Sequence, residues 1–138
     1  SIMVAHRIPY IATASVAYPE DLYRKMKKAK EIKGTRFFHI FAPCPSGWKS
    51  RPEDTIKLAR LAVQTCYFPL YEVEWGEKYT LNIKLKEKKP VVEYLRLQGR
   101  FSHLTEKEIN LIQAEVDRKW ERLLRLCGQA EERPAQQK

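Results

Sequence analysis

The sequence predicts an α/β fold, and three patterns along its 138 residues support this prediction. Two apolar runs of strand length, residues 8–15 and 37–42, flank an amphipathic segment at 19–32, which is the order of a β-α-β unit. Residues 70–85 alternate as the arms of a β-hairpin do, and residues 105–127 carry an apolar stripe at helical spacing. We therefore expect a sheet with a parallel part, an added hairpin and a C-terminal helix.

The β-α-β unit occupies the first third of the chain. Residues 8–15 are apolar and partly β-branched, which favours a buried strand. Pro19 suits the first turn of the helix, and Gly34 suits its end. Two strands joined through a helix run parallel in the same sheet, so the strands at 8–15 and 37–42 should be parallel neighbours.

The helix at 19–32 has one apolar face and one basic face. The basic residues are Arg24, Lys25, Lys27, Lys28 and Lys30. Such a run is typical of a solvated helix surface, and it also suits contact with phosphate groups or with an acidic protein.

The middle of the chain contains a second helix and the hairpin. Ser50 and Glu53 have the spacing of a capping box and predict a helix over residues 51–66. Alternation in the second arm of the 70–85 segment indicates an antiparallel hairpin. Residues 91–97 form a short apolar segment that is compatible with either a helix or a strand.

The last helix has the clearest start signal. Thr105 and Glu108 form a second capping box, and the apolar stripe continues to Cys127. Gly128 is predicted to end this helix. We expect residues 1–128 to form one domain and residues 129–138, which are polar and without periodicity, to form a flexible tail.

Composition restricts the class of protein. The net charge is +9 with three cysteines, there is no C-x-x-C pair, and no run of eighteen apolar residues occurs. We expect a soluble cytoplasmic protein without a membrane span. The basic charge leaves open a binding module for nucleic acid or for an acidic protein.

The loop after the second strand, residues 42–48, is the most specific feature. Its cysteine, Cys44, lies between two prolines at the carboxyl end of a predicted parallel strand, where ligands bind in open α/β sheets. Three interpretations remain open from the residues alone: a small buried hydrophobic side chain, a fixed ligand, and a nucleophile.

A nucleophilic cysteine needs a base, and the three histidines are weak candidates. His39 lies inside an apolar strand, and His6 and His103 occur without a partner pattern. Cys66 and Cys127 fall on apolar helix faces, so both are interpreted as core residues.

Several segments resemble, in order, the β subunit of pyruvate (2-oxoacid):ferredoxin oxidoreductases of the multi-subunit type, and specifically its C-terminal half. The segments that carry the resemblance are Ile8-Pro9-Tyr10-Ile11-Ala12-Thr13-Ala14-Ser15, Tyr18-Pro19-Glu20-Asp21-Leu22, His39 to Trp48, Leu61-Ala62-Val63-Gln64-Thr65, Phe68-Pro69-Leu70-Tyr71-Glu72 and Val92-Glu93-Tyr94-Leu95-Arg96-Leu97-Gln98-Gly99-Arg100-Phe101. The resemblance covers nearly the whole chain before the last helix. It implies part of a doubly wound, mainly parallel sheet, the thiamine-diphosphate-binding fold.

The resemblance also implies cofactors. In that family the β subunit binds thiamine diphosphate and magnesium and carries one 4Fe-4S cluster, and the matching position makes Cys44 its fourth iron ligand. The three earlier cluster cysteines are not in this sequence. The Gly-Asp-Gly motif and its asparagine, which hold the diphosphate through magnesium, are also not in this sequence. The resemblance assigns them to the N-terminal half, so this chain is either a fragment or one chain of a split subunit.

The implied reaction is oxidative decarboxylation of a 2-oxoacid, of the pyruvate type, with coenzyme A, giving acyl-CoA, CO2 and reduced ferredoxin. The implied partners are the missing N-terminal half, the other oxidoreductase subunits and ferredoxin. We expect the chain alone to be inactive and to bind thiamine diphosphate weakly or not at all. No catalytic acid or base is assigned, and the resemblance does not identify the 2-oxoacid.

Overall fold

The computed structural model describes residues 2–131, with side chains through residue 128. A four-stranded sheet has the order β2-β1-β3-β4. Its strands are β1 (Tyr10–Ser15), β2 (Arg36–Phe41), β3 (Tyr71–Glu74) and β4 (Lys78–Leu81). β1 and β2 are parallel, which confirms the predicted β-α-β unit, and β3 and β4 form the predicted antiparallel hairpin.

The sheet is mixed within the described residues. β3 pairs antiparallel with β1, so the hairpin contributes both antiparallel pairings and only β1 and β2 run parallel. The expected α/β class with a hairpin and a C-terminal helix is confirmed. The expected doubly wound, mainly parallel sheet is not what residues 2–131 display.

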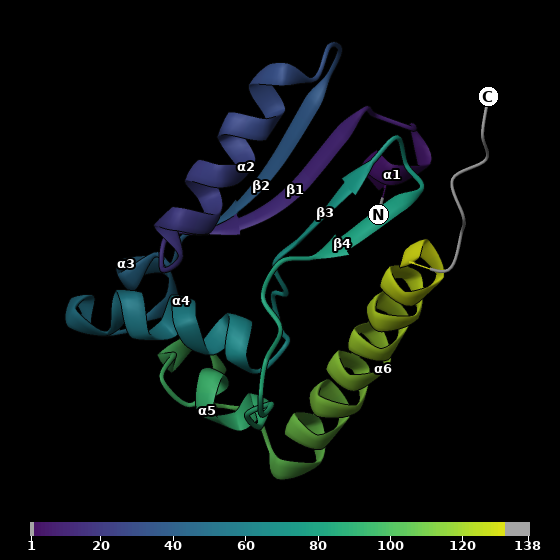
Figure 1. Cartoon of the computed structure of the whole chain (residues 1–138). Helices are drawn as coiled ribbons and strands as arrows, with labels where there is room; N and C mark the ends of the chain where they lie inside the picture. Colours follow the sequence, from purple (N-terminus) through teal and green to yellow (C-terminus); the bar gives the residue numbers. More distant parts are fainter. Residues whose placement is uncertain (1, 132–138) are drawn as a thin grey trace.

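Helix α2 (Pro19–Glu31) covers one face of the sheet (Figure 1). Tyr10, Ala12 and Ala29 are buried together at this contact, with Ile32 and Phe38 packed against them. Alternate residues of a strand point to opposite faces, so this contact defines the α2 face of the whole sheet. Pro19 and two acidic residues occupy the first turn of α2, as the helix dipole favours.

The larger core lies beyond the carboxyl end of β2. It joins α4 (Thr55–Gln64), the short α5 (Val91–Leu95) and the first half of α6 (Glu106–Glu131). Its buried members are Leu58, Leu61, Ala62, Cys66, Val91, Tyr94, Leu95 and Val116. The segment at 91–97, which had no predicted type, is therefore a helical turn that packs its apolar side chains against α4 and α6.

The two predicted capping boxes have different outcomes. At α6 the box is confirmed: the Thr105 N–H donates to Glu108 Oε2 at 2.8 Å, and the Glu108 N–H donates to Thr105 Oγ1 at 3.4 Å. At Ser50 and Glu53 the prediction is wrong. Pro52 begins a 3-10 turn, Pro52–Asp54, and α4 starts only after it. Ser50 Oγ is buried without a hydrogen-bond partner among the described residues.

Gly128 does not end the last helix, because α6 continues to Glu131. A Cβ at position 128 would meet nothing within 4 Å, so the glycine fulfils no packing requirement there. The remainder of the predicted tail, residues 132–138, lies outside the described residues. Among the described helices, none has a stretch long and apolar enough to cross a membrane.

Candidate functional site

Cys44 lies in the loop that follows β2, immediately before the four-residue helix α3 (Pro45–Trp48). Its side chain is exposed, so the interpretation as a small buried hydrophobic residue is wrong. The Trp48 N–H donates to the Cys44 carbonyl at 2.9 Å, and Lys49 ends the turn with a positive φ of 52°. Two prolines and this tight turn fix the backbone around the thiol.

A glycine leaves room beside the thiol. A Cβ built on Gly47 would lie 3.5 Å from Cys44 Sγ, which is an ordinary contact distance. Any longer side chain at this position would extend from that point beside the sulfur. The combination of an exposed, soft sulfur ligand and a small neighbour fits the contribution of one thiolate to an iron–sulfur cluster.

A second segment holds this loop from the far side. The Gly99 N–H donates to the Lys49 carbonyl at 3.0 Å. A Cβ at Gly99 would lie only 2.8 Å from Lys49 Cβ and 2.9 Å from its carbonyl oxygen, so the close approach requires a glycine. Gly99 begins the 3-10 turn Gly99–Phe101, which follows α5.

Arg100 completes this support by stacking. Its guanidinium lies 4.0 Å from the centroid of the Trp48 ring and 4.6 Å from that of Phe101. Its Nε also donates to Gln98 Oε1 at 3.0 Å, and Gln98, which is fully buried, donates to the Tyr94 carbonyl. The Cys44 loop is thus tied to the core through residues more than fifty positions later in the sequence.

The described residues give Cys44 no base for nucleophilic chemistry, because no hydrogen bond joins it to His6, His39 or His103. His39 is exposed on β2, with its ring edge-on to Phe68 at 5.0 Å between ring centroids. Within residues 2–131, no three His, Cys, Asp or Glu side chains gather closely enough to hold a metal ion. The interpretation of Cys44 as a fixed ligand therefore remains, and a metal site at Cys44 would need further ligands in addition to those of residues 2–131.

The other two cysteines have different positions. Cys66 is buried just after α4, and burial raises the pKa of its thiol to about 11, which keeps it protonated at neutral pH. This agrees with the predicted core role. Cys127 is half-buried on α6.

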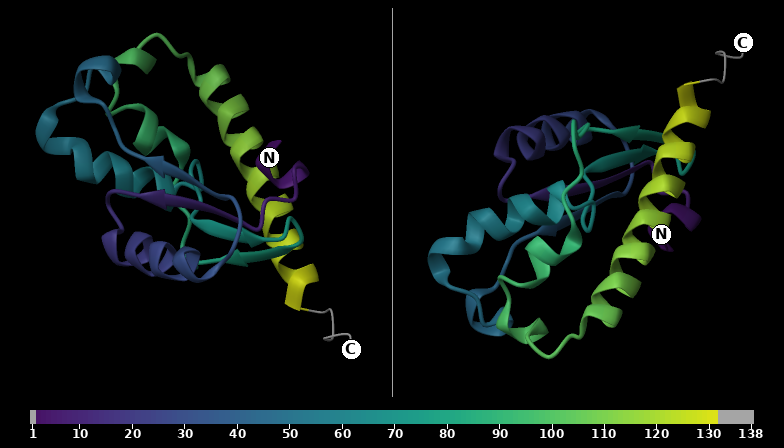
Figure 2. Two further views of the ribbon diagram at one scale, coloured as in Figure 1. Left: turned by 90° about the horizontal axis from the view of Figure 1, so that it is seen from above. Right: turned by 90° about the horizontal axis from the view of Figure 1, so that it is seen from below.

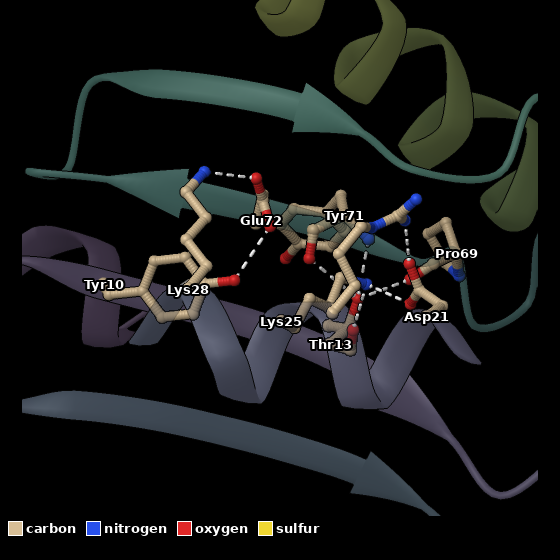
Figure 3. Close-up of polar contacts among 9 residues, drawn as sticks. Tyr10, Thr13, Asp21, Lys25, Lys28, Pro69, Tyr71 and Glu72 are labelled. Carbon is tan, nitrogen blue, oxygen red and sulfur yellow. Dashed lines mark hydrogen bonds and ion pairs between the residues drawn. The ribbon is translucent and has the colours of Figure 1, made fainter. Parts of the chain in front are cut away.

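The basic face of α2 is only partly a solvated surface, and for Lys25 that prediction is wrong. Lys25 is fully buried between α2 and the sheet, where its Nζ donates to Asp21 Oδ2 at 2.5 Å and to the Thr13 carbonyl at 2.7 Å (Figure 3). Asp21 also accepts from Arg24 Nη2 at 2.5 Å. Sequence spacing offered one signal, since Asp21 and Lys25 are four residues apart on a helix.

A second part of this network joins α2 to β3. Lys28 Nζ lies 2.6 Å from Glu72 Oε1, and the Tyr10 hydroxyl donates to Glu72 Oε2 at 2.8 Å (Figure 3). Lys28 Nζ also lies 2.9 Å from Glu74 Oε1. Burial opposes ionisation of Glu72, but the hydrogen bonds from Lys28 and Tyr10 outweigh it and hold its pKa below the usual value. These charges are structural, because each is directed at another side chain within the fold.

Comparison with known proteins places this α/β chain among subunits of enzyme complexes that act on 2-oxoacids. It is 56% identical over 128 residues to the ketoisovalerate oxidoreductase subunit VorB of Pyrococcus abyssi, covering 91% of this chain and 41% of the relative. It is 51% identical over 118 residues to the pyruvate synthase subunit PorB of Methanocaldococcus jannaschii, covering 86% of this chain and 39% of the relative. No protein-family model matches the chain.

The chain belongs to the family of these 2-oxoacid oxidoreductase subunits, and the resemblance identified from the sequence is confirmed. It spans about two fifths of the length of the curated relatives that it matches. The pyruvate synthase subunit PorB of Pyrococcus furiosus is a more distant relative, 42% identical over 120 residues, with 75% of this chain and 36% of the relative covered.

Proposed function

We propose that this chain is the C-terminal part of the β subunit of a 2-oxoacid:ferredoxin oxidoreductase, and that Cys44 supplies one thiolate of its 4Fe-4S cluster. The observation that carries the proposal is the exposed thiol on a fixed loop in a chain of this family. A 4Fe-4S cluster needs four ligands, so three of them would come from outside this chain.

The reaction is oxidative decarboxylation of a 2-oxoacid with coenzyme A, which gives an acyl-CoA, CO2, one proton and two electrons for ferredoxin. Thiamine diphosphate, bound with magnesium by the rest of the subunit, supplies the carbanion chemistry when it is present. The enzyme is therefore a multi-subunit complex, and this chain is inactive without the remainder of its subunit.

The residues of this chain supply one ligand of the cluster, Cys44, and keep that ligand in place. Cys44 presents a soft sulfur donor, which suits iron held among sulfides. Arg100 and Gly99 hold the turn that carries Cys44 through Trp48 and Lys49. A ligand whose position is fixed before binding keeps its geometry when the cluster changes charge.

The substrate class is a short-chain 2-oxoacid. Relatives named for ketoisovalerate share 54 to 56% identity with this chain, whereas those named for pyruvate share 42 to 51%. The pyruvate type expected from the sequence therefore needs testing beside a branched 2-oxoacid, with acyl-CoA formation from pyruvate and from ketoisovalerate as the measurement.

The alternative function, a basic module that binds nucleic acid, loses part of its basis. It depended on the net charge and on the lysine helix, but Lys25 is fully buried and Lys28 is paired with two carboxylates. A nucleic-acid affinity that falls steeply with salt concentration would support this alternative.

The test of the oxidoreductase proposal is Cys44→Ser in the complete complex. Serine oxygen is a poor ligand for iron among thiolates, so the 4Fe-4S cluster of the β subunit should be lost or weakened while thiamine diphosphate still binds. The measurements are iron per complex and electron paramagnetic resonance of the reduced clusters. Cys66→Ser and Cys127→Ser are the matched controls and should leave iron content unchanged. Full iron and unaltered spectra in Cys44→Ser would contradict the assignment.

A further inference from the structure

Two segments that are far apart in the sequence meet at the Cys44 loop, and both are basic. One is the loop itself, residues 42–50, and the other is the segment 96–103. Figure 2 shows the α3 turn and this green segment close together, and the Gly99 N–H bond to the Lys49 carbonyl joins them. The two segments contain no aspartate or glutamate, and their cationic side chains are Lys49, Arg96 and Arg100. The surroundings of the proposed iron ligand are therefore positively charged.

Arg100 is the member of this group that the fold holds directly against the loop. Its guanidinium lies 4.0 Å from the centroid of the Trp48 ring, and the Trp48 N–H donates to the Cys44 carbonyl. A second ring, that of Phe101, has its centroid 4.6 Å from the guanidinium. Two aromatic rings beside a cation displace water from it, and a charge acts more strongly on its neighbours where water is excluded.

The charge of Arg100 has no acidic partner within residues 2–131, because none of the ion pairs there includes it. Its Nε donates to Gln98 Oε1 at 3.0 Å, and an amide oxygen carries no net charge. Burial raises the pKa of the Tyr94 phenol, whereas the positive charge of Arg100 acts in the opposite direction. A guanidinium stays protonated even where it is partly buried, so these surroundings favour an anion nearby.

An iron–sulfur cluster held by thiolates is an anion of this kind. Reduction adds an electron to the cluster, and the net charge of the site is one of the factors that set the reduction potential. A fixed positive charge stabilises the reduced form more than the oxidised form, because the reduced form is more negative. The Gly99 N–H bond already ties the loop to the core without any charge, so the cation of Arg100 is an additional feature.

We propose that Arg100 is a positioning residue whose charge balances the cluster at Cys44. Its stack on Trp48 holds the guanidinium beside the loop, and from there the charge favours the reduced form of the cluster. This inference rests on the proposed function, since it takes a cluster at Cys44 as given. It adds to that function a residue that makes the cluster a better electron acceptor.

The test compares Arg100→Gln with Arg100→Lys in the complete complex. Glutamine removes the charge, whereas lysine keeps the charge but lacks the planar guanidinium that stacks. The measurement is a redox titration of the electron paramagnetic resonance signal that Cys44→Ser removes. At the wild-type midpoint potential, the ratio of reduced to oxidised cluster should fall at least about tenfold in Arg100→Gln, which is a shift of about 59 mV for one electron. In Arg100→Lys the ratio should stay within about threefold of the wild-type value.

Arg96→Gln is the matched control, because it removes the same charge from an exposed position in the same segment. The ratio of reduced to oxidised cluster should stay within about threefold of wild type in this variant. An unchanged potential in Arg100→Gln would overturn the proposal. Equal shifts in Arg100→Gln and Arg100→Lys would also overturn it, because loss of the stack alone would then explain the effect. An equal shift in Arg96→Gln would overturn it in favour of the general field of the protein.

Iron content decides the case in which a variant no longer holds its cluster. Loss of iron in Arg100→Gln, with iron retained in Arg100→Lys and Arg96→Gln, would support charge balance. Loss of iron in Arg100→Lys would overturn the proposal. Cys44→Ser separates this inference from the proposed function, because full iron in that variant would overturn both. Loss of iron in Cys44→Ser with an unshifted potential in Arg100→Gln would overturn only the role of Arg100.

Discussion

The two faces of the sheet are completed in opposite ways. On the α2 face, buried charges form ion pairs with charges of opposite sign: Lys25 is fully buried against Asp21, and Glu72 is buried against Lys28 (Figure 3). On the opposite face, an apolar groove separates β2 from α6 and leaves Leu111 open to solvent. The buried charges of the α2 face are paired within this chain, whereas apolar side chains of the opposite face remain exposed.

This difference shows that a cluster of charged residues can serve the packing of the fold itself, whereas an exposed apolar surface indicates a binding partner. A lysine-rich helix on a chain of net charge +9 suggests a surface that binds acidic partners. However, Lys25 and Lys28 form ion pairs that pack α2 on the sheet. Ion pairs of this kind favour one register of a helix over another, because a shifted helix would leave each charge buried alone. The exposed apolar groove, rather than the basic face of α2, is therefore the surface that indicates a binding partner.

The largest expected effect on the α2 face is that of Asp21→Ala. The substitution leaves Lys25 Nζ buried, with the Thr13 carbonyl as its remaining hydrogen-bond partner among the described residues. Burial already lowers the pKa of Lys25, and the Asp21 carboxylate opposes this shift. Removal of one partner from a buried pair should reduce the free energy of unfolding by about 3 kcal/mol, measured by denaturant titration of the complete subunit.

The double variant Asp21→Ala with Lys25→Met is the control for this interpretation. It removes both charges, so it should recover much of the lost stability. A loss below about 0.5 kcal/mol in Asp21→Ala would show that Lys25 reaches water and that the α2 face is not closed by this pair.

A smaller effect is expected for Glu72→Gln, with a dependence on pH. The folded-state pKa of Glu72 lies below its unfolded value, because hydrogen bonds from Lys28 and Tyr10 outweigh burial. Its carboxylate therefore stabilises the fold above the unfolded pKa of about 4.3, and this contribution is lost as pH falls through the folded pKa. The variant should lose about 1 to 2 kcal/mol at pH 7.

The measurement is the free energy of unfolding of wild type and Glu72→Gln between pH 3 and pH 7. The difference between them should shrink as the pH is lowered below the unfolded pKa. Glu77→Gln, at the exposed hairpin turn, is the control and should change stability by less than about 0.5 kcal/mol. A difference that stays constant with pH would contradict the role assigned to the carboxylate.

Local patterns in the sequence predicted most of the elements. The parallel β-α-β unit, the hairpin and the capping box of α6 all depend on residues close together in the chain, and all three are confirmed. The predicted cap at Ser50 failed because Pro52 starts a tighter turn first. The predicted stop at Gly128 failed because one glycine costs a long helix only about 1 kcal/mol.

The candidate site was only half predictable for a different reason. The position of Cys44 after a parallel strand follows from the local order of strand and loop, and its exposure is now established. Its support by Gly99 and Arg100 depends on contacts between residues fifty or more positions apart, which no local pattern reveals. The burial of Lys25 was not predicted for another reason: it depends on how α2 packs on β1, where Lys25 Nζ donates to the Thr13 carbonyl.

The smallest expected effect concerns the open face, where Leu111→Ser replaces a groove residue that is 64% exposed. In this chain alone the free energy of unfolding should change by less than about 0.5 kcal/mol, because little buried area is lost. Binding of a hydrophobic fluorescent dye should decrease, since the apolar groove is the surface that such a dye would occupy. Tyr23→Ser is the matched control: Tyr23 is 71% exposed but lies on α2, outside the groove, so dye binding should not change. Equal decreases in both variants would show that the dye reports exposed apolar area in general, and the contrast between a closed and an open face would lose its support.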